Sequence, residues 1–129
     1  MAEQICPACY RLIPAEAQAC PACPACGADL TALSARNYRD KLVGALNHPL
    51  DDVRLRAILA LGLRGQEDAA EALVDCALRH PIDVVEGLAV VGALARLGPA
   101  GRPALLKLAE RDPAHAVRVA ARQAAEGSR

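Results

Sequence analysis

A repeat of 32 residues constrains the fold of this 129-residue chain more than any other sequence feature. Three related segments, "ALNHPLDDVR", "ALRHPIDVVE" and "AERDPAHAVR", begin at Ala45, Ala77 and Ala109. Apolar residues keep the same register around them: the aligned sets are Leu42, Val74 and Leu106 upstream, and Val53, Val85 and Val117 downstream. A repeat of this length predicts similar units that stack on one another, because one unit cannot bury its own apolar face.

Each unit predicts two helices that meet at a proline. Leu42, Val43 and Leu46 share one helical face, which ends at Asn47-His48-Pro49. Proline is tolerated in the first turn of the next helix, which continues over 50–64 until Gly62 and Gly65 stop it. The later pairs are expected at about 67–79 with 82–97 and 100–111 with 114–126. The sequence therefore predicts a mainly α chain with three helical hairpins, in repeats of about 33–65, 66–98 and 99–129.

The unit "HP-x-x-x-VR-x-x-A-x-x-AL-x-x-x-G" resembles HEAT repeats, especially the short HEAT-like kind of bacterial proteins and bilin-lyase subunits. The resemblance covers about residues 38–127. It implies a right-handed α-solenoid whose second helices line a concave face, and a structural ladder of Asp and Arg between repeats. The ladder positions here are Asp52 with Arg54, then Asp83 with Glu86, then Ala116 with Arg118, so the pattern is imperfect in the second and third repeats.

The first 32 residues have a different composition, and five of the six cysteines lie within residues 6–26. About thirty residues with few large apolar side chains cannot bury enough apolar surface to fold alone. Two thiols in a Cys-x-x-Cys turn can reach one tetrahedral ion, and four thiolates bind zinc tightly. Such closely spaced pairs in a chain expected in the reducing cytoplasm indicate a metal rather than disulfides. We therefore expect one structural zinc ion in residues 1–32.

"CPAC…IP…A…CPAC" followed by "CGADL" resembles the short zinc ribbons of bacterial and archaeal proteins, over nearly all of residues 5–30. One extra "PAC" triplet leaves two alignments open. Aligned from the left, the resemblance implies the ligands Cys6, Cys9, Cys20 and Cys23. Aligned from the right, it implies Cys6, Cys9, Cys23 and Cys26. The right alignment is favoured because it keeps Gly27, which permits positive φ, and lengthens only the hairpin. Cys20 is the competing ligand to Cys26.

Charge and hydropathy restrict the partners that we expect. Lys and Arg together number 15, as do Asp and Glu, so no net charge draws the chain to nucleic acid or membrane. No run of about 18 apolar residues occurs, and "MAEQICPACY" lacks the order of a signal peptide. We expect a cytoplasmic protein that binds another protein and is a monomer or a weak homodimer.

No catalytic set of residues emerges from the sequence, which favours a non-enzymatic adaptor. A partner's helix or extended segment is expected to dock on the face formed by helices 50–64, 82–97 and 114–126. The residues to test there are Arg54, Arg56, Glu86, Arg118 and Arg122. One alternative is a nucleic-acid-associated regulator that uses the zinc ribbon and the basic last repeat. Another, by analogy alone, is an accessory protein acting on bilin groups.

Several conspicuous residues have structural explanations. His48 and His80 precede prolines at helix ends, which predicts caps or turn residues, and Cys76 is expected to be a small buried side chain. Arg54 and Arg118 are expected to be structural residues of the ladder between repeats rather than residues that contact a ligand. The six basic against three acidic residues of 99–129 predict a solvated face. The zinc ribbon is expected to cover the first hairpin near Tyr38.

Overall fold

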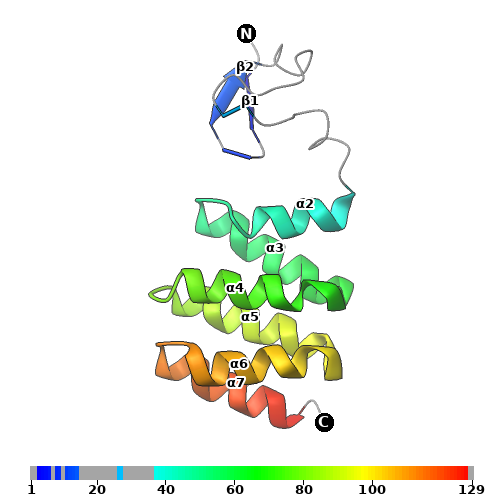
Figure 1. The fold of residues 1–129 in the computed structure, drawn as a ribbon, viewed down its shortest axis with the longest axis vertical. Helices are drawn as coiled ribbons and strands as arrows, with labels where there is room; N and C mark the ends of the chain where they lie inside the picture. Colours follow the sequence, from blue (N-terminus) through cyan, green and yellow to red (C-terminus); the bar gives the residue numbers. More distant parts are fainter. Residues whose placement is uncertain (1–2, 7, 10, 15–25, 28–36, 128–129) are drawn as a thin grey trace.

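The computed structural model describes residues 3–6, 8–9, 11–14, 26–27 and 37–127. Six α-helices follow one another in residues 37–127 and form three hairpins (Figure 1): α2 (Tyr38–Ala45) with α3 (Asp51–Arg64), α4 (Ala70–Arg79) with α5 (Val84–Arg96), and α6 (Arg102–Arg111) with α7 (His115–Gly127). Two 3-10 turns, η2 (Glu67–Ala69) and η3 (Gly98–Gly101), precede α4 and α6. The mainly α fold with three hairpins is confirmed.

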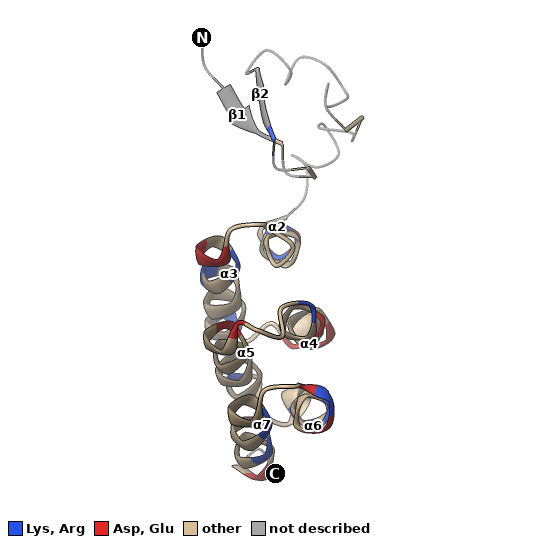
Figure 2. Ribbon diagram, turned by 90° about the vertical axis from the view of Figure 1, so that its left-hand side faces the viewer, with Lys and Arg blue, Asp and Glu red and all other residues tan. Residues whose placement is uncertain are grey.

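The hairpins stack so that their helices form two rows (Figure 2). One row contains α3, α5 and α7, and we call it the second-helix row; α2, α4 and α6 form the first-helix row. In the second-helix row α3 packs on α5 and α5 packs on α7, so neighbouring repeats meet through these helices. This is the stacking that the sequence repeat predicts, because each hairpin buries its apolar face against the next one.

The helices begin and end at residues with clear local reasons. The side chain of Asn37 accepts a hydrogen bond from the Asp40 N–H at 2.8 Å and caps α2. Asp83 caps α5 in the same way, because its Oδ1 atom accepts a hydrogen bond from the backbone N–H of Glu86 at 2.9 Å. Helix α5 therefore begins at Val84, two residues later than the sequence predicted. Gly65 ends α3 in the left-handed conformation with φ of 65°, as predicted.

Gly62 does not stop the helix, contrary to the sequence prediction. It lies inside α3 and is buried. A Cβ atom at this position would lie 2.9 Å from the Cα of Ala93 in α5, so glycine is required for the close approach of the two helices. Gly87 of α5 has a similar role, since a Cβ there would lie 2.8 Å from Cγ2 of Val117 in α7.

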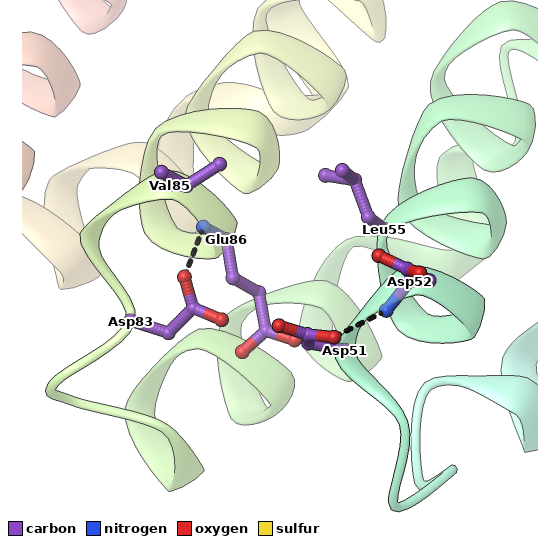
Figure 3. A pocket seen from close by; sticks show the side chains of 6 residues that line it. All are labelled: Asp51, Asp52, Leu55, Asp83, Val85 and Glu86. Carbon is purple, nitrogen blue, oxygen red and sulfur yellow. Dashed lines mark hydrogen bonds between the residues drawn. The ribbon is translucent and has the colours of Figure 1, made fainter.

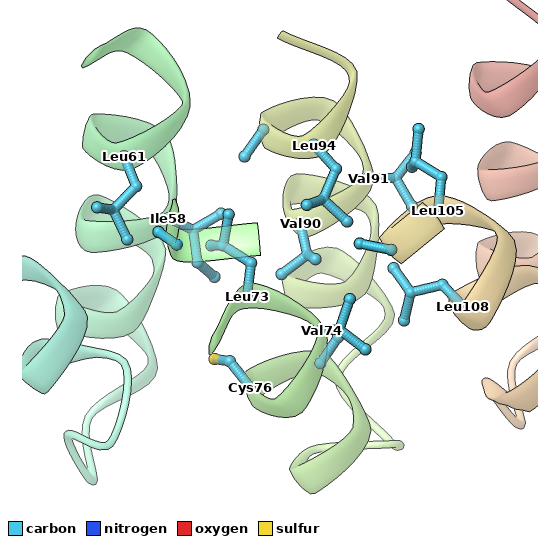
Figure 4. Close-up of a cluster of buried hydrophobic side chains, with 14 of the residues drawn as sticks. Ile58, Leu61, Leu73, Val74, Cys76, Val90, Val91, Leu94, Leu105 and Leu108 are labelled. Atoms are coloured by element: carbon cyan, nitrogen blue, oxygen red, sulfur yellow. The ribbon is translucent and has the colours of Figure 1, made fainter. Parts of the chain in front are cut away.

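The core lies between the two rows and consists almost entirely of Leu, Ile, Val and Ala (Figure 4). Leu61, Leu73 and Leu94 are among its fully buried members. Cys76 is also fully buried, which confirms its prediction as a small core residue. The repeat aligns Leu106 with Leu42 and Val74, which are buried. In α6, however, Leu106 is exposed and the preceding residue, Leu105, is buried instead.

The N-terminal part contains a two-stranded antiparallel sheet. Strand β1 (Glu3–Ile5) pairs with β2 (Leu12–Pro14), and Gln4 stands opposite Ile13. The sheet lies beyond α2 at the N-terminal end of the stack (Figure 1). We expected the N-terminal module to cover Tyr38, but Tyr38 is 58% exposed. The guanidinium carbon of Arg64 lies over the Tyr38 ring, 5.0 Å from its centre.

Candidate metal centre and partner surface

Three of the predicted zinc ligands meet at the end of the β1–β2 hairpin. The thiol sulfurs of Cys6, Cys9 and Cys26 all lie within 4.8 Å of one another, although Cys26 is far from the other two in sequence. Cys6 is buried, and its backbone N–H donates to the Arg11 carbonyl at 3.0 Å, which closes the turn that carries Cys9. The N–H of Ala8 also points at the Cys6 sulfur, at 3.4 Å.

The geometry of these thiols fits a tetrahedral metal site. The Sγ atoms of Cys6 and Cys26 are 3.8 Å apart. Zinc–sulfur bonds of about 2.3 Å in a regular tetrahedron place the sulfurs about 3.8 Å apart. A backbone N–H directed at a sulfur also suits a thiolate, because it partly offsets the negative charge. The donor set therefore fits zinc bound by cysteine thiolates.

The position of Cys26 bears on the choice between the two alignments. Gly27 has φ of 77°, and no atom lies within 4 Å of the place a Cβ would take, so the backbone conformation alone requires glycine there. Both the meeting of Cys26 with Cys6 and the positive φ of Gly27 agree with the right alignment. The other two predicted ligands, Cys20 and Cys23, lie outside the described residues.

A second cluster joins the first two repeats inside the solenoid. The Arg54 Nε atom of α3 donates to Oε1 of Glu86 in α5 at 2.5 Å, and both side chains are buried. The Nη1 atom of Arg54 donates to the carbonyls of His48 and Pro49 at 2.8 and 3.1 Å. Burial lowers the pKa of Arg54, while the hydrogen bond and charge of Glu86 raise it, and the net direction is upward. Arg54 is therefore a charged ladder residue, as predicted.

His80 completes this cluster at the end of α4. Its Nδ1 atom lies 2.8 Å from the Cys76 carbonyl oxygen and 2.9 Å from Oε2 of Glu86. Both neighbours are acceptors, so Nδ1 must carry a hydrogen. His80 thus ends α4 as a cap, as predicted. It also contacts the carboxylate of Glu86, a contact that the sequence pattern does not predict.

Cys76, His80 and Glu86 also place ligand atoms within 4.8 Å of one another. Burial is the main cause that raises the pKa of the Cys76 thiol to about 11, with Glu86 adding to the effect. A metal ion here would have to displace the thiol proton and share Glu86 with the charge of Arg54. We therefore assign this cluster to the contact between repeats.

The arginine of the third repeat makes the same turn contacts as Arg54, but within the described residues it forms no ion pair with a carboxylate. Arg118 donates from Nη1 to the carbonyls of Asp112 and Pro113 at 2.8 and 2.9 Å, as Arg54 does in its own repeat. Two further basic residues of the last repeat are also engaged: Lys107 pairs with Glu71 at 2.8 Å, and Arg102 donates to the Ala125 carbonyl. His48 accepts a hydrogen bond from the Leu50 N–H at 3.1 Å, which agrees with its predicted turn role.

The five residues expected to contact a partner therefore have different positions. Arg54 and Glu86 are buried against each other, so their side chains do not form part of an outer surface. Arg118 is half-buried at its turn, and only Arg56 and Arg122 are exposed. The sequence pattern could not separate these cases, because the period aligns positions 54, 86 and 118 without saying how far each is buried.

Sequence reasoning missed the apolar character of the second-helix row. Leu59 and Leu63 of α3 are 51% and 71% exposed, and Val85 and Leu88 of α5 are 67% and 41% exposed. We call these four residues the α3–α5 face. In the first-helix row of the described chain, the large exposed apolar residues are Tyr38 and Leu106. The sequence does contain an indication of this face, because Leu55, Leu59 and Leu63 are spaced by four residues and so lie on one side of α3.

A pocket of about 230 Å³ opens beside this face, where α3 and α5 begin (Figure 3). We call it the acidic pocket. Leu55 and Val85 supply its apolar wall, and the remaining lining residues are Asp51, Asp52, Asp83 and Glu86. Four carboxylates and two apolar side chains thus surround one hollow between neighbouring repeats.

Comparison with known proteins identifies the repeat. The family model for HEAT repeats matches residues 25–92 and 40–126. No curated protein and no solved structure matches the chain. None of the described helices has the length and apolar character needed to cross a membrane.

Proposed function

This chain belongs to the family of HEAT repeats, and on that premise we propose that it is a non-enzymatic protein-interaction scaffold. Helical repeats of this kind offer an extended surface rather than a deep site, and a partner's helix or extended segment can lie across it. We propose the second-helix row as the docking surface, with the N-terminal zinc module as a structural unit.

The observation that carries this proposal is the exposed apolar α3–α5 face. Leaving Leu63, Val85 and their neighbours in water is unfavourable, and an exposed patch of large apolar side chains marks an interaction site. The first-helix row is the natural comparison, because α4 exposes polar residues such as Glu71 and Asp75. The asymmetry between the two rows favours docking on the second.

Site-specific photo-crosslinking in cells tests this surface. A photoreactive amino acid placed at Leu59 or Leu88 should yield a covalent protein adduct, whereas the same amino acid at Asp75 of α4 or Glu110 of α6 should not. All four positions are exposed, so they differ in row and not in accessibility. Adducts that form only from Asp75 or Glu110 would place the partner on the first-helix row and refute the proposal.

We further infer that Cys6, Cys9, Cys23 and Cys26 hold one zinc ion. The mutual approach of Cys6, Cys9 and Cys26 and the positive φ of Gly27 support this set. Four thiolates around zinc would stabilise a module that has little core of its own. The ion would have no open position for a substrate, so its contribution is to folding.

Metal content of single variants tests the ligand set. Native mass spectrometry should find one zinc ion in the wild-type chain and in Cys20→Ser, and a loss of zinc in Cys6→Ser, Cys23→Ser and Cys26→Ser. Cys76→Ser is the matched control, because Cys76 lies in the solenoid core. Retention of zinc by Cys26→Ser together with its loss from Cys20→Ser would favour the left alignment instead.

A further inference from the structure

The acidic pocket contains more negative charge than the fold balances. Glu86 is paired with Arg54 inside the solenoid. For Asp51, Asp52 and Asp83, no Lys, Arg or His of the described chain comes within 4.0 Å of the carboxylate. The three groups stand at the beginning of two adjacent helices and converge on one hollow (Figure 3).

Local structure explains part of this arrangement but not all of it. Asp83 caps α5, and Asp51 accepts a hydrogen bond from the Asp52 N–H at 2.8 Å. Acidic residues are also favourable at helix N-termini. Asparagine caps a helix equally well, however, and capping does not require Leu55 and Val85 to line the same pocket. An apolar wall below a rim of carboxylates suits a side chain with an aliphatic stem and a cationic head.

The apolar surface continues from the pocket along α3. Leu55, Leu59 and Leu63 are spaced by four residues and so lie on one side of the helix. Leu88 lies one turn beyond Val85 on α5. At the far end of the two helices the charge is reversed, since Arg96 is exposed there. Its Cδ atom lies 3.5 Å from the place of a Gly62 Cβ, which puts its side chain beside α3. The surface therefore runs from acidic through apolar to basic.

We propose that the partner segment binds with a Lys or Arg side chain in the acidic pocket and with apolar residues on the α3–α5 face. This inference rests on the proposed docking function and adds the chemistry of the partner. The stem of the basic residue contacts Leu55 and Val85, and its charge meets Asp51, Asp52 and Asp83. The basic charge of the segment is concentrated at one end, because Arg96 repels cations at the other.

Selection of linear peptides from a random display library on the immobilised full-length chain tests this chemistry. We expect enriched peptides to carry Lys or Arg at one end of a group of Leu, Ile, Val or Phe. Their binding should weaken about tenfold in the triple variant Asp51→Asn, Asp52→Asn, Asp83→Asn, and should fall as salt rises. Asparagine at position 83 keeps the cap of α5, and circular dichroism would verify that the variant is folded.

The matched control is Glu67→Gln, Asp75→Asn, Glu110→Gln, which removes the same charge from exposed positions outside the acidic pocket. This variant should bind the peptides as the wild type does. Equal weakening in both triple variants would show that net charge rather than the pocket attracts the peptide, and would overturn the proposal.

A third variant, Leu59→Ser with Leu88→Ser, separates this inference from the docking function. Loss of binding here, with no effect of the three asparagines, would leave the docking surface intact and overturn the basic anchor. Enrichment of acidic peptides would also overturn it, as would competition by a second copy of the chain seated on the face. If no peptide is enriched, or if the enriched peptides bind all of these variants equally well, both the basic anchor and the docking surface are refuted.

Discussion

Arg54 and Glu86 bring opposite charges into an interior built mainly of Leu, Val and Ala. Removing a charge from water is costly, and the attraction between the two groups offsets that cost only while both are present. The guanidinium of Arg54 also reaches the carbonyls of His48 and Pro49, which fixes the turn before α3. The pair therefore links the position of one repeat to the loop of another.

Replacement of Arg54 alone should destabilise the solenoid strongly. Arg54→Met leaves Glu86 buried without its counter-charge, and we expect the free energy of unfolding to fall by about 3–5 kcal/mol. Urea denaturation followed by circular dichroism measures this change. The double variant Arg54→Met, Glu86→Met is the control and should recover most of the loss; a double variant as unstable as the single one would show that the contacts of Arg54 with the carbonyls dominate.

The buried thiol of Cys76 should make the stability of the chain depend on pH in the alkaline range. Its pKa is about 11 in the folded chain against 9.0 for an unperturbed thiol. Above pH 9 the unfolded chain releases the thiol proton while the folded chain keeps it, so the free energy of unfolding should fall between pH 9 and 11, by at most about 1.4 kcal/mol per pH unit. Below pH 9 this group should contribute no slope.

Comparison with Cys76→Ala isolates this contribution, because the other titrating groups are shared. Urea denaturation at intervals from pH 8 to 11 should show the wild-type stability falling more steeply than that of the variant. Parallel curves over the whole range would mean that the thiol ionises within the folded solenoid as readily as in the unfolded chain.

At the scale of the helices, two glycines of α5 have opposite roles. Gly87 allows Val117 of α7 to approach, whereas Gly92 is exposed and has no atom within 4 Å of a Cβ position. Gly87→Ala should lower stability by about 1–3 kcal/mol through overpacking. Gly92→Ala should raise it by about 0.5–1 kcal/mol, because alanine favours the helix interior. Thermal melts of both variants measure the difference, and a neutral Gly87→Ala would imply that α7 can shift away without loss.

The elements themselves were largely predictable from the sequence. The proline period and the apolar spacing located six helices to within about three residues, since both features are local. The starts of α4 and α6 were placed too early because 3-10 turns precede them, and a 3-10 turn shares the residue preferences of a first helical turn. The sequence predicts a helix stop at Gly62, whereas the structure requires glycine there because of α5, which is distant in sequence.

The candidate sites were predictable only in part, for the same reason. The Cys-x-x-Cys turn suggested Cys6 and Cys9, because such a turn is local, whereas Cys26 came from the resemblance to zinc ribbons and from the preference for Gly27. The pairing of Arg54 with Glu86 needed the stacking of two repeats, although their separation by one period and their opposite charges contained the clue. The acidic pocket required the two helix starts to be placed side by side, which no window of sequence describes.

At the scale of the whole molecule, the first repeat provides its own solvent-facing end. Lys41 of α2 is exposed, and Arg39 pairs with Asp40 and with Asp68 of the next repeat at 2.7 and 3.0 Å. A terminal helix with a polar outer surface can end a stack of repeats without further cover. The exposure of Tyr38 is consistent with this role.

Removal of residues 1–32 should therefore change the melting temperature of the solenoid by no more than about 3 °C. Differential scanning calorimetry of the shortened and full-length chains measures the difference. Leu46→Ala in the full-length chain is the control: Leu46 is buried, so its truncation should lower the melting temperature clearly and show that the first repeat contributes to the transition. A large fall on removal of residues 1–32 would mean that the N-terminal module supports α2.

The buried ion pair between Arg54 and Glu86 limits how such a chain can grow by gene duplication. A copy of the first repeat inserted beside the original would set arginine against arginine, and a copy of the second would set glutamate against glutamate. Each would bury like charges where the present chain has an ion pair. Lengthening is therefore easiest in units of two repeats, and the order of the existing repeats cannot be exchanged freely, even though they share one sequence period.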